Sequence, residues 1–265
     1  MNCANQALIL FVLGTIPGMF ASHTVPQRSF IIHCTALMFG FLFWISLLLT
    51  EQSRRGTTYE RALIYMSAGL LGFSVGIHLI PDSRLTLYMV FLAYVHFSEF
   101  YLVSVNSEHA TFDSFLLNHG KEYATAYTIS MIEFHFSPLR NVSPHMHYGA
   151  IISFVGLGLR AIAMITAASG FTHLIARRRS STHKLITHGI YAYMRHPAYC
   201  GWIIWVIGSQ IILGNMICLI LFSVVTWKFF SERIPYEEKL LIDFFGNDYL
   251  LYRFRTRFSG VPFIS

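Results

Sequence analysis

Residues 198–230 read AYCGWIIWVIGSQIILGNMICLILFSVVTWKFF, two apolar runs that are separated only by Gly214 and Asn215. A two-residue break of this kind predicts a tight turn between antiparallel helices. The two runs, 198–213 and 216–230, are each shorter than the roughly 20 residues that a bilayer-crossing helix needs. We therefore predict a helical hairpin that enters the membrane and returns the chain to the side on which it began.

The composition of the whole chain also indicates a membrane protein. Of its 265 residues, 54% are hydrophobic and only 12% are charged, and the mean hydropathy is +0.52. A soluble domain usually carries about 25% charged residues. Together with the hairpin, six further apolar runs predict an all-α, polytopic transmembrane bundle of about eight spans. These runs cover residues 7–21, 29–50, 62–80, 85–105, 123–136 and 148–171.

The positive charges orient this bundle. If both termini face the cytosol, 14 of the 19 Lys and Arg residues fall on cytosolic segments and three fall on the opposite side. Such an excess is the positive-inside pattern of membrane proteins. The basic residues lie between apolar runs, so they indicate topology and contact with anionic membrane lipid, and we expect no nucleic-acid partner.

The chain divides unevenly along its length. Residues 1–145 read as a transmembrane scaffold, whereas residues 146–265 contain one long span, a basic linker, the hairpin and a charged tail. From Ser231 onward the pattern predicts a soluble helix followed by a loop, packed on the cytosolic face. The four cysteines show no paired metal-ligand spacing, so we expect neither a zinc site nor a disulfide framework.

Four ionisable residues fall within predicted spans, where a charge left in lipid costs several kcal/mol. One explanation is that they pair with one another across helices. The other is that Arg160 lines a cavity for an anionic group of a lipidic substrate. The four are His96, Glu99, Glu133 and Arg160.

The basic linker and the start of the hairpin, residues 183–201, read HKLITHGIYAYMRHPAYCG. Proline favours the first turn of a helix and pushes the preceding residue into extended backbone, so His196 should lie at the mouth of the helix that starts at Pro197. The amides of Ala198 and Tyr199 would then be free at a helix N-terminus, where they attract a carboxylate.

Two other residue types in this linker suit a bound nucleoside. Tyr191 and Tyr199 offer aromatic faces that could cover an adenine or a sulfonium. Gly189 allows the backbone to turn and to approach a ligand closely.

The segment SERIPYEEK, residues 231–239, follows the hairpin. Arg233 and Glu237 are four residues apart, so in a helix they share a face and form a surface ion pair. Because the hairpin returns the chain to its starting side, this face should meet the His196 segment at one cytosolic site.

The combination of RHPAY at 195–199, a short membrane hairpin, and Glu237-Glu238 resembles the isoprenylcysteine carboxyl methyltransferase family. The likeness is densest over residues 160–265 and includes FGNDY at 245–249. It is closest to eukaryotic members, which reside in the endoplasmic reticulum membrane. The motifs are shared more loosely with phospholipid N-methyltransferases and sterol reductases.

The resemblance implies a function for each part of the chain. S-adenosylmethionine would bind in a cytosolic pocket of a catalytic region, residues 146–265, while residues 1–145 would also receive the lipid substrate. The substrates would be prenylated proteins of the CaaX type, and Arg233, as catalytic and substrate-binding residue, would hold their C-terminal carboxylate. The resemblance assigns the cofactor to His183, Lys184, Leu185, Ile186, Gly189, Tyr191, His196, Pro197, Ala198, Tyr199 and Glu237.

The expected reaction is a direct displacement at the methyl carbon by the substrate carboxylate. A carboxylate with a pKa of about 3.5 is already ionised at neutral pH, so no general base and no metal is required. Three alternatives stay open: a phospholipid N-methyltransferase, a membrane sterol reductase that uses NADPH, and a lipid transporter or scaffold without enzymatic activity.

Overall fold

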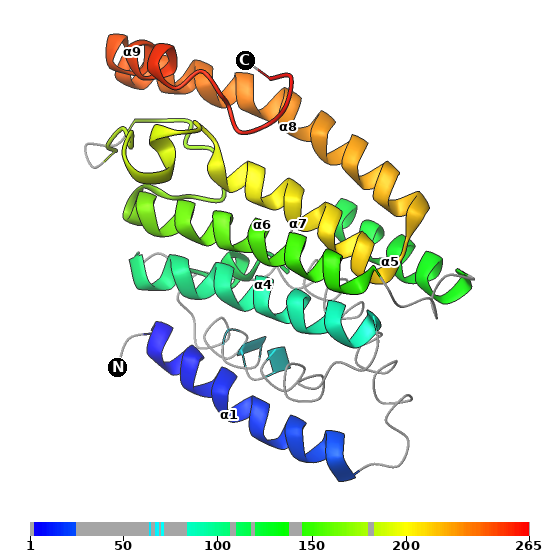
Figure 1. Cartoon of the computed structure of the whole chain (residues 1–265). Helices are drawn as coiled ribbons and strands as arrows, with labels where there is room; N and C mark the ends of the chain where they lie inside the picture. The colour runs from blue at the N-terminus through cyan, green and yellow to red at the C-terminus, as the bar shows by residue number, and fades with distance from the viewer. Residues whose placement is uncertain are drawn as a thin grey trace. The chain divides into compact units, whose positions relative to one another are not determined.

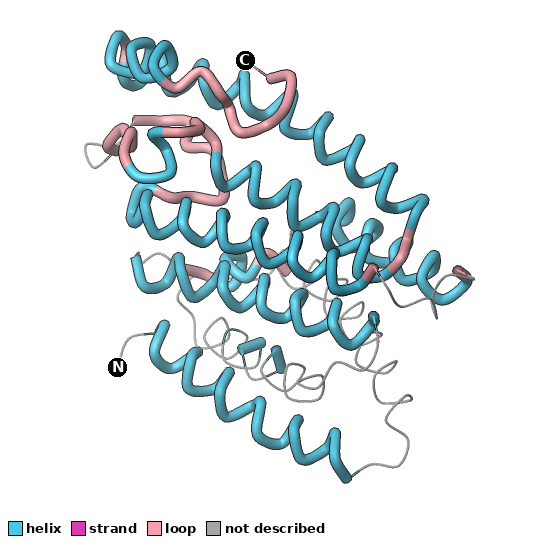
Figure 2. The backbone as a smooth tube through the Cα atoms, viewed as in Figure 1, coloured by secondary structure: helices cyan, strands magenta, loops and turns pink. Residues whose placement is uncertain are grey.

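The structure of the chain is a computed structural model that describes residues 3–24, 64, 67–68, 70–71, 84–106, 110–117, 120–137, 145–179 and 183–264. All regular elements in these residues are helices, which confirms the all-α class (Figures 1 and 2). The chain forms two compact units, Met1–His147 with Gln210–Asn215, and Tyr148–Ser209 with Met216–Ser265. The functional division into residues 1–145 and 146–265 stays a prediction.

The first unit contains α1 (Cys3–Thr24), α4 (Arg84–Asn106), the short 3-10 helix η1 (Phe112–Phe115) and α5 (Lys121–Phe136). Aromatic stacking joins α1 to α4 and α4 to η1, because the Phe11 ring lies 3.9 Å from that of Phe97 and the Phe100 ring lies 4.2 Å from that of Phe115. His96 is fully buried on α4, with Nδ1 2.8 Å from the Phe115 carbonyl oxygen and Nε2 3.2 Å from the Tyr123 hydroxyl. A buried imidazole with a partner on each nitrogen is satisfied without carrying a charge.

The predicted hairpin is present, and polar contacts hold its turn in the first unit. The side-chain amide of Asn215 donates from Nδ2 to the Ser130 carbonyl at 2.8 Å, and the Ser130 hydroxyl donates to Gln210 Oε1 at 3.0 Å. Arg84, also buried, donates from Nη1 to the Leu213 carbonyl at 3.3 Å. The last carbonyls of a helix have no intrahelical partner, so the Arg84 guanidinium caps this helix end.

The second unit contains α6 (Met146–Ala167), η3 (Ala168–Gly170), η4 (Gly189–Ala192), α7 (Pro197–Leu213), α8 (Met216–Phe245) and α9 (Asn247–Arg255). The helix α8 corrects one prediction. Ser231 was expected to open a separate soluble helix, but α8 continues through it to Phe245 with Pro235 inside. Pro235 lies on the exposed side, where the backbone carbonyl that loses its N–H partner can be solvated.

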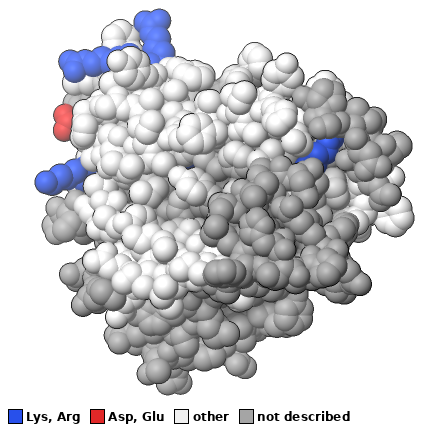
Figure 3. Space-filling model, turned by 60° about the horizontal axis from the view of Figure 1, so that its bottom comes forward, with Lys and Arg blue, Asp and Glu red and all other residues white. Residues whose placement is uncertain are grey.

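Helix lengths and exposed apolar residues both suit a bilayer. Within the described residues, α4 and α6 extended by η3 are long and apolar enough to cross a membrane, and shorter apolar helices cover Ala4–Ile16 and Pro197–Leu213. The predicted span 29–50 and most of 62–80 lie outside the described residues. The described part of the face in Figure 3 carries few charged side chains, and these lie near its margins. On α6, Phe154 is 73% exposed.

Helices α6 and α7 pack closely through glycines, in agreement with their neighbouring ribbons in Figure 1. A Cβ added at Gly156 would lie 2.6 Å from the Trp205 amide nitrogen and 2.7 Å from the Gly201 carbonyl oxygen. Small residues allow two membrane helices to approach to backbone contact, which maximises their van der Waals packing. Arg160, one turn further along α6, donates from Nη1 to the Ala198 carbonyl at 3.1 Å and lies 5.0 Å from the Trp202 ring. The role of Arg160 toward a substrate stays a prediction.

This packing predicts that Gly156→Ala lowers the thermal unfolding temperature of the purified protein by several degrees, because α7 must move away from the added methyl group. Overpacking of this kind costs about 1–3 kcal/mol. The matched control is Gly158→Ala on the same helix, where an added Cβ meets nothing within 4 Å. Equal unfolding temperatures for the two variants would contradict the proposed role of the contact.

Candidate functional site

The site is built around the start of α7, where the predicted placement of His196 and Pro197 is confirmed. Pro197 is the first residue of the helix, and His196 precedes it with a buried side chain. The Tyr199 amide donates to the His196 carbonyl at 3.1 Å. The expectation that this amide is free for a ligand is therefore wrong, because the first turn closes with a 3-10 hydrogen bond that already uses it.

The C-terminal segment lies against the start of α7 and fixes its backbone. The amides of Arg195 and His196 donate to the carbonyls of Phe258 at 3.1 Å and Ser259 at 2.8 Å. Gly260 follows with a φ of +103°, and a Cβ at this position would lie 2.9 Å from the His196 carbonyl oxygen. Only glycine adopts this backbone conformation without strain and leaves room for the close approach.

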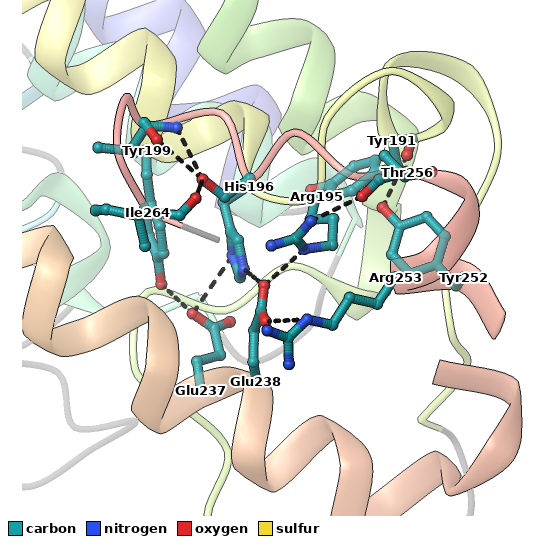
Figure 4. A network of polar contacts seen from close by, with 12 residues as sticks. Tyr191, Arg195, His196, Tyr199, Glu237, Glu238, Tyr252, Arg253, Thr256 and Ile264 are labelled. Atoms are coloured by element: carbon teal, nitrogen blue, oxygen red, sulfur yellow. Dashed lines mark hydrogen bonds and ion pairs between the residues drawn. The ribbon is translucent and has the colours of Figure 1, made fainter. Parts of the chain in front are cut away.

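Arg195 and Glu238 form a buried ion pair beneath this backbone contact (Figure 4). Arg195 Nε donates to Glu238 Oε1 at 2.7 Å, and the two side chains are 1% and 3% exposed. Arg195 Nη1 donates to the carbonyls of Thr256 at 2.7 Å and Arg257 at 2.6 Å. One guanidinium thus joins the start of α7, the helix α8 and the chain that leaves α9.

Glu238 has two further partners, which keep it ionised. His196 Nε2 lies 3.2 Å from Oε1, and Arg253 Nε lies 3.4 Å from Oε2. Burial alone would raise the pKa of the Glu238 carboxyl, but the hydrogen bonds from His196 and Arg195 outweigh it and lower the pKa to about 2. The Glu238 carboxylate is therefore fully charged at neutral pH. Its contact with His196 Nε2 orients the imidazole.

A second chain of contacts joins Arg233 and Glu237 through Tyr199. Arg233 Nε donates to the Tyr199 hydroxyl at 2.9 Å, and that hydroxyl donates to Glu237 Oε2 at 2.6 Å. The direct surface ion pair expected between the two residues is thus replaced by a bridge, because the phenol from α7 lies between them. The Tyr199 ring also stacks on Phe230 with a centroid distance of 4.5 Å and is parallel to the His196 ring at 5.4 Å.

The guanidinium of Arg233 is oriented from three sides. Besides the Tyr199 contact, Nη2 donates to the His173 carbonyl at 2.9 Å, and the group lies 5.7 Å from the Phe229 ring. Among the contacts of the described residues, none involves Nη1. This nitrogen can therefore bind an oxygen of an incoming anion while the rest of the fork stays fixed.

Gly189 and Tyr191 both lie in η4. Tyr252 of α9 donates from its hydroxyl to the Tyr191 carbonyl at 2.7 Å, and the Tyr191 hydroxyl donates to the Ala163 carbonyl at 3.4 Å. Burial raises the pKa of the Tyr191 hydroxyl to about 12, with the nearby Glu237 charge adding to the shift. Gly189 has a φ of +59°, and a Cβ there would lie 2.9 Å from Thr166 Cγ2.

The contacts of the described residues join several of the residues that were assigned to the cofactor. His196 Nδ1 lies 3.9 Å from Glu237 Oε2, and the Tyr199 hydroxyl links Glu237 to Arg233. Residues 183–188 form an irregular segment in which the Lys184 side chain is exposed. Within this segment, the His183 ring lies 6.1 Å from the Phe244 ring of α8. The assignment of the cofactor to these residues stays a prediction.

Sequence reasoning missed several members of the site. Arg195 and Glu238 belonged to the motifs that carried the family resemblance, yet neither received a role. Two charged residues next to predicted site residues could have suggested a buried pair, since charges are rarely buried unless they are paired. The carbonyls of His173, Thr256 and Arg257 left no signal, because any residue type supplies a carbonyl.

Comparison with known proteins places this arrangement in a family. Residues 150–243 match the model of the isoprenylcysteine carboxyl methyltransferase family. A solved structure of a eukaryotic intramembrane Ras methyltransferase of that family has a TM-score of 0.81 and 30% sequence identity, and the alignment covers 100% of this chain and 99% of that one.

Curated relatives named protein-S-isoprenylcysteine O-methyltransferase give the same result. The Xenopus laevis protein is 38% identical over 76% of this chain and 74% of its own length. The Schizosaccharomyces pombe protein is 36% identical over 78% of this chain and 98% of its own length. The human protein is 40% identical over 67% of this chain and 64% of its own length.

The buried pair predicts a large effect of Glu238→Gln on stability. Removing the negative charge leaves Arg195 buried and unpaired, which costs about 3–5 kcal/mol at pH 7. Because the folded-state pKa is depressed, this stabilisation is present above pH ~4.5 and is lost as the pH falls toward about 2. Thermal unfolding from pH 7 down to pH 3 should therefore show the wild type approaching the variant.

Glu232→Gln is the control, since this glutamate is exposed on the same helix. It should unfold like the wild type at every pH. A constant difference between Glu238→Gln and the wild type across the pH range would contradict the role given to the ionised carboxylate.

Proposed function

Because this chain belongs to the isoprenylcysteine carboxyl methyltransferase family and methylates the C-terminal carboxylate of prenylated cysteine, we propose that Arg233 holds that carboxylate and that S-adenosylmethionine is the methyl donor. The observation that carries the proposal is the fixed orientation of the Arg233 guanidinium. Arg233 and Glu237 lie on α8, and Tyr199 from the start of α7 bridges the two side chains.

The side chains around Glu237 fit this cofactor. Glu237 is 26% exposed and its Oε2 already accepts from Tyr199, so a further donor can reach this carboxylate from solution. A carboxylate suits the ammonium group of the methionine part, to which it offers a charge-assisted hydrogen bond. The parallel rings of His196 and Tyr199 provide flat faces for an adenine or a sulfonium. S-adenosylmethionine, when bound, supplies the methyl group as an electrophile on sulfur.

The protein's task is then to position the substrate carboxylate. Tyr199 and the His173 carbonyl occupy Nε and Nη2 of Arg233, which leaves Nη1 for the substrate. We propose that this nitrogen binds one carboxylate oxygen and leaves the other as the nucleophile. A bidentate grip would hold both oxygens and reduce their nucleophilicity, whereas the bridged arginine holds the acid in a single orientation.

The membrane setting follows from the same proposal. The prenyl chain resides in the bilayer and the cofactor is water-soluble, so both can reach only a site at the membrane surface. We propose a multi-pass enzyme of the endoplasmic reticulum with about eight spans and a cofactor pocket that faces the cytosol, in agreement with the excess of positive charge on that side. Residues 1–145 would receive the prenyl chain, and residues 146–265 would perform the methylation.

The direct test is incubation of the purified protein with labelled S-adenosylmethionine and a short farnesylated cysteine acceptor, followed by measurement of base-labile methyl ester. Arg233→Ala should lower kcat/KM by about 100-fold or more, and Arg233→Lys should not restore it, since a lysine cannot contact Tyr199, His173 and substrate together. The unfolding temperature should stay within a few degrees of the wild type.

Arg178→Ala is the matched control, because this arginine is exposed in the linker after α6. It should keep wild-type turnover. Wild-type methyl ester formation in both Arg233→Ala and Glu237→Ala would remove the site assignment. Methylation of a phospholipid amine in place of the farnesylated acid would favour the amine methyltransferase, whose cationic acceptor would be repelled by Arg233.

The bridge predicts that Tyr199→Phe lowers kcat/KM by about 10-fold or more, because Arg233 loses its Nε partner while the ring keeps its stacking on Phe230. A double-mutant cycle separates this effect from a general loss of packing. If Tyr199 acts by orienting Arg233, the double variant Tyr199→Phe/Arg233→Ala should be no slower than Arg233→Ala alone. Fully additive losses would show that Tyr199 acts independently of the arginine.

A further inference from the structure

The helix α9 presents apolar side chains on the face that points away from the protein. Leu250, Leu251 and Phe254 are 45%, 55% and 71% exposed. Their spacing places them on one side of the helix. The opposite side carries Tyr249 and Tyr252, which are buried. α9 is therefore apolar on both sides, although only one side is covered by the chain.

The polar residues of α9 lie along the edges of this exposed face. Arg253 and Arg255 project between the inner and the outer sides of the helix, and Asp248 is its one acidic residue. Beyond the last turn, the guanidinium of Arg257 lies 5.6 Å from the Phe254 ring, so a further positive charge stays close to the apolar face.

The cytosolic end of α8 provides a contrast within the same unit. Its exposed positions include Glu232, Lys239 and Asp243, which is the ordinary pattern of a solvated helix. α9 is shorter and more highly charged in sequence than the membrane hairpin, yet it exposes large apolar residues beside its exposed charged residues Asp248 and Arg255. Exposure of its outer face to water is therefore unfavourable.

We propose that α9 lies flat in the headgroup layer of the membrane, with Leu250, Leu251 and Phe254 inserted and with Arg255 and Arg257 bound to anionic lipid headgroups. A helix with an apolar face edged by arginines is the pattern of interfacial helices. The chain belongs to a family of intramembrane enzymes, so a bilayer surface is adjacent at all times, whereas a soluble partner is not. Positive charge on this edge complements anionic lipid. The inference does not depend on which acceptor is methylated.

The contacts on the inner side of α9 connect the proposed lipid contact to the functional site. Tyr252 holds the Tyr191 carbonyl, and Arg253 contacts Glu238, which is paired with Arg195. Lipid that holds the outer face of α9 in place would therefore also stabilise the segment around Tyr191 and the ion pair beneath His196. Anionic lipid should act on the site through α9 without touching substrate or cofactor.

The test places a nitroxide spin label at Leu251→Cys or Phe254→Cys, in a full-length variant that lacks the native cysteines and retains methyltransferase activity. The protein is reconstituted in lipid nanodiscs, and collision of the label with lipid-soluble oxygen is compared with collision with a water-soluble nickel chelate. An inserted helix should favour oxygen by about threefold or more at both positions. The control, Lys239→Cys on the polar face of α8, should favour nickel.

A second arm varies the charge of the lipid. Labels on α9 should lie deeper in discs that contain about 30% phosphatidylserine than in discs of phosphatidylcholine alone. Arg255→Gln/Arg257→Gln should remove this difference, whereas Arg177→Gln/Arg178→Gln, which removes the same charge from exposed positions on the linker, should preserve it.

The outcomes are separable. Labels that meet nickel at both positions would overturn the proposal, because the face would then be in water. Labels that meet neither reagent would overturn it in favour of a protein partner or a second copy of the chain. An equal depth in both kinds of disc would overturn the assignment of the arginines to anionic headgroups. None of these results would alter the assay with farnesylated cysteine, so failure here and failure of the proposed function can be told apart.

Discussion

The ion pair between Arg195 and Glu238 is the contact on which the rest of the site depends. Both side chains are almost completely buried, and each charge would be very costly there without the other. A pair of this kind adds little net stability over an apolar pair of similar size. It accepts few alternative arrangements, because Nε and Nη1 of Arg195 and both carboxylate oxygens of Glu238 each meet a partner in a defined place. It therefore specifies how three distant segments meet.

The geometry of the proposed chemistry follows from that constraint. Glu238 fixes α8 against the start of α7, and one residue earlier on α8 Glu237 meets the Tyr199 hydroxyl. One turn before Glu237, Arg233 meets the same hydroxyl from the other side. The phenol of Tyr199 can thus accept from the arginine and donate to the glutamate at once. The two charged groups stay close without neutralising each other directly, which leaves a positive group for the proposed substrate contact and a negative one for the proposed cofactor contact.

Much of the fold could be predicted from the sequence, because the relevant patterns are local. The hairpin followed from two apolar runs and a Gly-Asn break, and Pro197 placed His196 at a helix start. The meeting of the His196 segment with the Arg233 and Glu237 face followed from the antiparallel geometry. The bridge through Tyr199 could not be derived, since it depends on which way a side chain of α7 points once both helices are packed. The closed first turn of α7 and the carbonyls that orient Arg195 and Arg233 also arise from backbone positions that residue types do not encode.

The continuity of α8 through Pro235 suits the proposed position of the site at a membrane surface. The buried residues Phe230, Ile234 and Glu238 follow one another at intervals of four, so one helix face passes from apolar packing to an ion pair without a break. The neighbouring face carries Phe229, Arg233 and Glu237 at the same interval, with the arginine lying near the Phe229 ring. If a separate helix had begun at Ser231, a break in the helix would have separated Arg233 and Glu237 from Phe229 and Phe230. A single rigid helix instead fixes the distance of Arg233 and Glu237 from the apolar turns that precede them on α8. This fixed distance suits the proposed binding of a prenylated acid, with its tail in lipid and its carboxylate at the membrane surface.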